Sequence, residues 1–314
     1  MTIGTVQVQA GEKKSGFLLV EGDTCQIPIT VICGGIGPVT LITAGIHNAE
    51  YVGIQAAIEL SRELQPEGIE GTLILAPLVN VSGFTHRTMS TVWEDGKNLN
   101  REFPGNPMGT LAERICYTLE RDLFSLADYY LDLHGGDGYE EMCPHVYFVG
   151  QGNPQVREKS LHMAQCVEVD YVVESKYTTG GAYNYASSLG IPSILLERGG
   201  RGLWSQREVD QDKEDVRRVL DFLYQEDRVV EQEQTLLQET IYENAPITGC
   251  WYAYKKAGER FAKGEILGEI RDYFGQSLHI CRARADGVVL YQTASLTVLK
   301  DGPMVAYGVH TADT

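Results

Sequence analysis

Short apolar runs alternate with segments of helical periodicity up to about residue 227, and this alternation restricts the fold more than any other feature of the sequence. The apolar runs have the length of buried strands and lie at residues 27–33, 39–44, 72–78, 129–133, 146–149, 171–173 and 193–196. Segments 52–64, 111–123 and 206–225 carry apolar residues at helical spacing. Strands that are apolar on both faces and separated by helices predict an α/β fold, with a mostly parallel mixed sheet flanked by helices.

The pattern changes after this region. Residues 226–243 are rich in Glu and Gln, and we expect them to bridge two units. From residue 245 onward, short strand-like runs at 249–254, 264–270 and 285–291 alternate with turns, and helical periodicity is missing. The sequence therefore predicts an α/β domain over residues 1–238, followed by a small all-β domain over residues 239–314.

The charge and the apolar runs limit the partners of the protein. Its 314 residues include 43 acidic and 26 basic side chains, a formal net charge of −17. Such a field repels phosphate backbones, and no basic stripe is present, so we expect no nucleic-acid binding. No apolar run approaches the roughly 18 residues of a membrane span. The N-terminus lacks a signal-peptide pattern, so we expect a cytoplasmic protein without a membrane partner. A homo-oligomer is compatible with the sequence.

Seven cysteines lie scattered along the chain, and none forms a CxxC pair. A disulfide framework or a thiolate zinc site is therefore a poor interpretation. Any metal ion must be held by histidine and carboxylate side chains.

Three motifs that could bind a metal ion each follow an expected strand. His47 and Glu50 come after residues 39–44, His134 comes after residues 129–133, and Glu197 closes residues 193–196. Ligands of an open α/β sheet bind at the carboxyl ends of its strands. The motifs together supply two imidazoles, a carboxylate ligand and a spare carboxylate, as in catalytic His₂Glu zinc sites. Asp132, two residues before His134, either orients that imidazole or is merely solvated.

Each motif alone also has an ordinary structural explanation. His47 and Glu50 can mark a helix N-terminus, His134 can cap a turn, and Glu197 can pair with Arg198 or Arg201. Only their common position at strand ends favours a shared site. Manganese or cobalt would suit the same ligands as zinc.

A fourth motif is the Pro/Gly-bounded segment 97–105, which contains Asn100 and Arg101. An amide beside a planar guanidinium is suited to binding a carboxylate. The alternative is an ordinary surface arginine in a loop.

The ordered set His47-x-x-Glu50, Asn98-Leu-Asn-Arg-Glu-Phe-Pro-Gly105, Asp132-Leu-His134 and Glu197-x-Gly-Gly resembles the succinylglutamate desuccinylase/aspartoacylase family, relatives of the zinc carboxypeptidases. The resemblance covers nearly the whole chain, because residues 264–289 are similar to the β-domain appended in that family. It implies one Zn²⁺ per chain, held by His47, Glu50 and His134. It also implies that Glu197 is the general base and acid.

The resemblance implies substrate contacts as well. Asn100 and Arg101 would bind the carboxylate of the amino-acid part, and Arg87 would stabilise the developing oxyanion. A pocket tyrosine commonly precedes the catalytic glutamate, and Tyr183 and Tyr177 both qualify.

The sequence departs from the family pattern at two positions. Asn48 stands where glycine is common, so the pocket is expected to differ there. Arg198 follows Glu197, where a small or apolar residue is usual. Arg198 is therefore a candidate for binding an anionic acyl or side-chain group, or it points away into a salt bridge.

We therefore predict a zinc-dependent hydrolase that cleaves the amide of a small-molecule N-acyl amino acid and releases a carboxylic acid and a free amino acid. A metallocarboxypeptidase would use the same residues. A biotinyl or lipoyl carrier is disfavoured because the turn at 285–287 has no lysine. A zinc-dependent binding protein without catalysis is disfavoured by Glu197 and Arg101.

The net charge bears on the choice of substrate. The global field opposes an anionic substrate, so Arg87, Arg101 and Arg198 would have to make the pocket locally positive. If they do not, a neutral or cationic substrate becomes the better interpretation.

Overall fold

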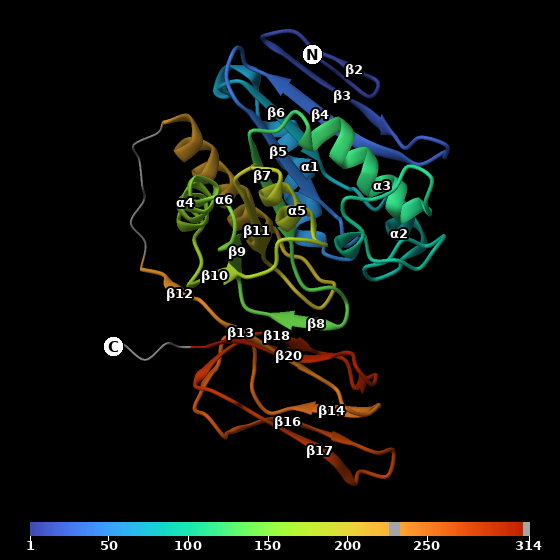
Figure 1. Cartoon of the computed structure of the whole chain (residues 1–314), viewed down its shortest axis with the longest axis vertical. Coiled ribbons are helices and arrows are strands. Elements are labelled where there is room, and N and C mark those ends of the chain that lie inside the picture. Colours follow the sequence, from blue (N-terminus) through green and yellow to red (C-terminus); the bar gives the residue numbers. More distant parts are fainter. Residues whose placement is uncertain (226–232, 310–314) are drawn as a thin grey trace.

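The computed structural model describes residues 1–225 and 233–309 and confirms the predicted fold class (Figure 1). A large part built around one mixed sheet lies above a smaller part made of C-terminal strands. In spatial order, the main sheet within the described residues contains β12 (Thr235–Leu237), β10 (Tyr171–Ser175), β9 (His145–Val149), β11 (Ser193–Glu197), β7 (Tyr129–His134), β5 (Val39–Ala44), β6 (Thr72–Ala76), β4 (Gln26–Cys33) and β3 (Glu12–Leu19).

The three central strands β5, β7 and β11 run parallel to one another. Their register places Ala44 beside Leu133 and Glu197 beside His134. The carboxyl ends of these strands therefore meet at one edge of the sheet, as the positions of the sequence motifs predict.

Helices cover both faces of the main sheet. The core on one face includes α1 (Tyr51–Glu63), α4 (Pro154–Gln165) and α6 (Gln206–Tyr224). The core on the other face includes α3 (Leu111–Leu119), its continuation η3 (Glu120–Phe124) and α5 (Ala182–Ser188). The remaining short elements are α2 (Val81–His86), η1 (Pro66–Gly68), η2 (Leu99–Arg101) and the hairpin of β1 (Thr2–Ile3) with β2 (Val6–Gln7).

The described C-terminal strands form two further sheets, and no helix occurs among residues 233–309. One contains β13 (Thr240–Asn244), β20 (Pro303–Val309), β18 (Gly287–Thr293) and β15 (Arg260–Phe261), and the other contains β17 (Ser277–Arg282), β16 (Ile266–Arg271), β14 (Gly249–Ala253) and β19 (Thr297–Val298). Trp251, Phe261 and Tyr307 pack in their core. The strand β8 (Glu140–Met142), which follows the His134 turn, pairs with β18 and so joins the two parts.

The expected linker at 226–243 lies partly outside the described residues, because residues 226–232 are not described. Its later residues are ordered strands: β12 extends the main sheet beside β10, and β13 begins the C-terminal sheets. The division at 238/239 stays a prediction.

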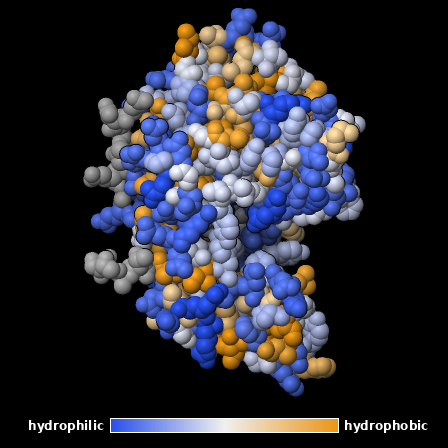
Figure 2. Space-filling model, in the orientation of Figure 1, coloured by the Kyte–Doolittle hydropathy of each residue, from blue (hydrophilic) through white to orange (hydrophobic). Residues whose placement is uncertain are grey.

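The surface seen in Figure 2 is mostly hydrophilic, with apolar side chains in scattered patches. Within the described part of the chain, every helix is too short or too polar to cross a bilayer.

His145 in β9 gives the fold a predictable response to acid. Its Nδ1 donates a hydrogen bond to the Cys143 carbonyl at 2.8 Å, and burial lowers the pKa of the imidazole to about 4. In the unfolded chain this imidazole has a pKa near 6.5, so the unfolded state binds more protons between pH 6.5 and 4. The stability of the fold therefore falls as the pH is lowered through that window.

We expect His145→Gln to be less sensitive to acid than the wild type. Between pH 7 and 4, the unfolding free energy of the wild type should fall by up to about 3 kcal/mol more than that of the variant. Urea titrations across this range measure the difference. The exposed His86 is the control, and equal losses in wild type and His145→Gln would contradict the prediction.

Candidate metal centre and active site

His47 and Glu50 lie in the turn between β5 and α1. Gly45 turns the chain out of the strand with φ +65°, and a Cβ there would collide with Leu78 and Ile54. Glu50 is the residue that immediately precedes the first turn of α1. His134 is the last residue of β7, the strand next to β5.

The side chains of these three residues converge. His47 Nδ1 lies 2.7 Å from Glu50 Oε1, and His134 Nδ1 lies 2.8 Å from Glu50 Oε2. One ligand atom of each residue lies within 4.8 Å of the others. His134 and Glu50 are almost fully buried, whereas the His47 side chain is 15% exposed. Burial would raise the pKa of Glu50, but the charges of the two facing imidazoles lower it to about 2.

The other ring nitrogen of each imidazole lies close to a side-chain oxygen. His134 Nε2 lies 3.1 Å from Asp132 Oδ2, and Asp132 Oδ1 accepts a 2.7 Å hydrogen bond from the Thr43 hydroxyl. His47 Nε2 lies 3.0 Å from Asn98 Oδ1. Asp132 is fully buried beside His134, so it is not a solvated side chain. Burial lowers the pKa of His134, but the Asp132 and Glu50 charges outweigh this effect and raise it above its usual value.

The donor set fits a zinc ion. Both Nδ1 atoms lie against the Glu50 carboxylate, and an acceptor oxygen lies behind each imidazole, as is usual for metal-binding histidines. Two imidazoles and a carboxylate are a common ligand set of catalytic zinc.

Glu197 ends β11, where its backbone is in register with that of His134. Within the described residues, its Oε2 is buried and has no hydrogen-bond partner. Burial raises the pKa of this carboxyl well above its usual value, and the nearby Glu50 charge raises it further. A carboxyl of this kind can accept and return a proton near neutral pH.

A cavity of about 920 Å³ opens beside His47, between the main sheet and the C-terminal strands. From the larger part it is lined by Asn98, Asn100, Arg101, Asp137, Glu140, Tyr147, Tyr177 and Tyr183, and from the C-terminal strands and turns by Tyr242, Asn244, Tyr291, Thr293 and Asp301. Both parts of the molecule therefore shape the space next to the candidate metal centre.

Asn100 and Arg101 enter this cavity from η2. The Asn100 side-chain oxygen accepts the Ala182 backbone N–H at 2.8 Å, so its amide nitrogen is the group available to a ligand. Arg101 Nη1 donates to the Asn100 backbone oxygen at 2.7 Å, which holds the guanidinium at the cavity wall. The tyrosine candidates Tyr183 and Tyr177 also line the cavity.

Glu50, His134 and Glu197 are not among the residues that line this cavity. Two further candidates, expected to contact the substrate, do not line it either. Arg87 is exposed at the C-terminal end of α2, in the left-handed conformation with φ 57°. Arg198 is only 4% exposed and forms an ion pair with Asp215 on the α6 side of the sheet. Of the two interpretations that the sequence left open for Arg198, the structure shows the salt bridge that points away.

Asn48, the departure from glycine, also points away from the cavity. Its side-chain oxygen accepts hydrogen bonds from Asn80 Nδ2 at 3.0 Å and from the Thr88 hydroxyl at 3.2 Å. Its amide nitrogen donates to the Thr88 carbonyl. Asn48 therefore ties the turn that carries His47 to α2 and the segment after it.

Sequence reasoning missed several residues of the cavity wall. Asp137 and Glu140 follow His134 closely, and this short separation was a usable signal. Tyr242, Tyr291 and Asp301 belong to distant C-terminal segments. No motif in those segments indicates that they meet the His134 turn.

Comparisons with known proteins identify the relatives of this chain. Residues 36–223 match the model of the succinylglutamate desuccinylase/aspartoacylase catalytic domain. An N-alpha-acetyl-L-2,4-diaminobutyric acid deacetylase from Halomonas elongata is 32% identical over 176 residues, which are 54% of this chain and 51% of the relative. The match to this curated relative thus spans about half of its length.

Solved structures extend the likeness over nearly the whole chain. The product-bound ectoine utilization protein EutE (DoeB) from Ruegeria pomeroyi superposes with a TM-score of 0.86 and 26% identity, covering 98% of both chains. A succinylglutamate desuccinylase/aspartoacylase from Rhodobacter sphaeroides superposes with a TM-score of 0.84 and 25% identity over the same shares. With the catalytic-domain match over more than half of its residues, this chain belongs to the succinylglutamate desuccinylase/aspartoacylase family.

Proposed function

We propose that the protein is a zinc-dependent deacylase that hydrolyses the amide bond of an N-acyl amino acid, releasing a carboxylic acid and a free amino acid. The observation that carries this proposal is the convergence of His47, Glu50 and His134, with the partly buried Glu197 side chain beside the same strand end. The family of the chain supports an amide-cleaving hydrolase.

His47, Glu50 and His134 would hold the ion, which supplies Lewis-acid chemistry and a water of lowered pKa when bound. Glu197 takes the proton from the attacking water and returns it to the departing amine. Its buried environment suits both steps, because it holds the carboxyl pKa above the usual range.

Asn100 and Arg101 are proposed to bind the α-carboxylate of the substrate. Both lie at the wall of the cavity, and a guanidinium beside an amide donor can bind both carboxylate oxygens.

Arg101→Ala is therefore expected to weaken the binding of substrates that carry an α-carboxylate. A lost charge-assisted hydrogen bond of this kind corresponds to a rise in KM of about 10- to 100-fold. Steady-state kinetics on an N-acetyl amino acid and on the corresponding uncharged α-amide measure the effect. Equal losses on both compounds would show that Arg101 does not recognise the carboxylate.

The charge of the cavity favours a cationic substrate side chain. Asp137, Glu140 and Asp301 line it, and Arg101 is the one lysine or arginine among its described lining residues. Asp137 is 8% exposed, and the one hydrogen bond given for its carboxylate among the described residues is accepted from the Tyr139 N–H. Since Arg87 and Arg198 lie elsewhere, we infer a substrate such as an N-acetyl diamino acid, the class named for the Halomonas relative.

A substrate panel tests this inference. We expect kcat/KM for Nα-acetyl-2,4-diaminobutyrate to exceed that for N-acetylaspartate and N-succinylglutamate by at least about 10-fold, as expected for one well-placed charge pair. Asp137→Asn should reduce this preference. A preference for the anionic compounds would contradict the cationic assignment, and faster cleavage of a tripeptide would favour the metallocarboxypeptidase.

A further inference from the structure

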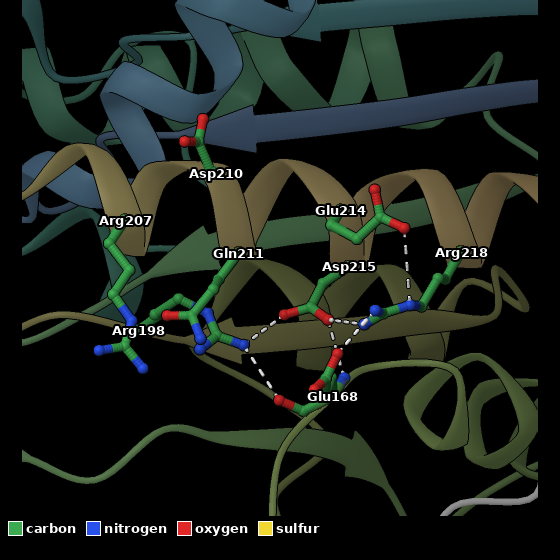
Figure 3. A pocket seen from close by; sticks show the side chains of 8 residues that line it. All are labelled: Glu168, Arg198, Arg207, Asp210, Gln211, Glu214, Asp215 and Arg218. Carbon is green, nitrogen blue, oxygen red and sulfur yellow. Dashed lines mark hydrogen bonds and ion pairs between the residues drawn. The ribbon is translucent and has the colours of Figure 1, made fainter.

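A second cavity, of about 480 Å³, lies on the α6 side of the main sheet (Figure 3). Its wall includes Arg198, the residue after β11, and Arg207, Asp215 and Arg218 from α6. Figure 3 shows Arg198 directed toward Asp215 and Glu168, whereas the Arg207 guanidinium has no dashed contact to the residues drawn. Arg198 is the residue that follows Glu197 in the chain.

Alternation along β11 places these two neighbours on opposite sides. Leu195 lines the active-site cavity, whereas Leu196 packs in the core shared with α6. Successive strand side chains point to opposite faces, so Glu197 belongs to the cavity side and Arg198 to the α6 side. The guanidinium is therefore anchored behind the sheet that presents the catalytic carboxyl.

Arg198 is also the last anchored side chain before a glycine-rich turn. Gly199 and Gly202 have φ values of +87° and +58°, and Gly200 lies between them. Arg201 is 57% exposed. Within this described turn no other side chain is buried, and Arg201 pairs with Glu141 at the surface.

The contacts of Arg198 reach in two directions. Its side chain pairs with Asp215, donates to the Glu168 carbonyl at 3.2 Å and lies 3.9 Å from Asp212 Oδ1. Its backbone N–H donates to the His134 carbonyl at 3.1 Å. Both Asp212 and Asp215 are about 1% exposed, so the anchor is buried.

We propose that Arg198 is a positioning residue: its buried ion pair with α6 fixes the end of β11 and thereby holds the Glu197 carboxyl at its place beside His134. This role rests on the proposed deacylase reaction, in which Glu197 transfers the proton. Arg198 contributes to kcat through the position of Glu197 and does not contact the substrate.

The test compares Arg198→Lys and the double variant Arg198→Met/Asp215→Leu with the wild type. The double variant removes both members of the Arg198–Asp215 pair together, so Asp215 is not left as a buried carboxylate without its cation. Burial raises the pKa of the remaining Asp212 to about 8, so that carboxyl is largely neutral near pH 7. We expect its kcat to fall at least 10-fold while KM stays within twofold, with metal content and circular dichroism unchanged. Arg198→Lys, which keeps the charge but not the planar fork, is expected to be intermediate. Arg207→Ala, at the wall of the same cavity, is the control and should match the wild type.

A folded double variant with wild-type kcat would overturn the proposal, and so would wild-type kcat in Arg198→Lys if the double variant does not fold. A crystal structure of the variant supplies a readout that does not depend on activity, because the Glu197 carboxyl should be displaced relative to His134. An unmoved carboxyl would also overturn it. If the wild type cleaves no N-acyl amino acid, the proposed function fails, and the carboxyl position still decides the positioning role.

Discussion

Replacing Glu197 by glutamine is expected to lower kcat for amide hydrolysis by at least about 10³-fold, within the range that a lost general acid–base contributes. The amide keeps the size and one acceptor oxygen of the side chain but cannot take the proton from water. His47, Glu50 and His134 are untouched, so metal content should equal that of the wild type. Steady-state assays of amino-acid release measure kcat, and metal analysis of the same samples measures the metal content.

The control for this variant is Glu214→Gln, a half-exposed glutamate on α6. It should leave kcat unchanged. Ordinary turnover in Glu197→Gln would show that another group transfers the proton.

Removing a metal ligand is expected to have the second large effect. His134→Ala deletes one of the two imidazole ligands, so we expect the variant to lose its bound metal. Its activity should fall by more than about 10³-fold, because the water of lowered pKa is lost with the ion.

Asp132→Asn keeps the His134 ligand but removes the negative charge that lies 3.1 Å from its other ring nitrogen. Loss of such an outer partner typically costs 10- to 100-fold in metal affinity or activity.

Equilibrium dialysis against zinc, followed by assays at saturating metal, separates these two variants. Asp132→Asn should recover most of its activity at high zinc concentration, and His134→Ala should not. If His134→Ala bound zinc with wild-type affinity, the proposed ligand set would be wrong. Circular dichroism checks that each variant is folded.

The sequence predicted the structure best where burial of apolar side chains dominated. The runs that became β5, β7 and β11 are apolar on both faces, so burial determined their conformation. The residues at their carboxyl ends could then be predicted to meet, and His47, Glu50 and His134 do converge. The spacing of the motifs did not decide whether Glu50 or Glu197 is the metal ligand. The resemblance to the family supplied that assignment.

Elements with little apolar signal were missed. β3 begins Glu-Lys-Lys-Ser and lies at the sheet edge, where one side is exposed, so its pattern did not indicate a strand. α4 buries only a narrow stripe that includes Val156 and Met163 and is otherwise polar. Its capping Asn153 and following proline were the usable signals.

Side-chain direction just beyond a strand was the other limit. Arg198 lies one residue past β11, and its sequence context suits either face of the sheet. In the structure, the alternation along β11 continues to Arg198, and the packing of α6 against the sheet brings Asp215 to it. The contributions of Tyr242, Tyr291 and Asp301 to the cavity likewise depend on how two distant parts of the chain meet.

The most direct test of a zinc-dependent deacylase is a depletion and reconstitution assay on Nα-acetyl-2,4-diaminobutyrate. Chelator-treated, dialysed protein should release no free diamino acid. Addition of one equivalent of Zn²⁺ per chain should restore the wild-type rate, while Glu197→Gln binds the same equivalent and stays inactive. Unchanged hydrolysis by metal-free protein, verified by elemental analysis, would contradict the account.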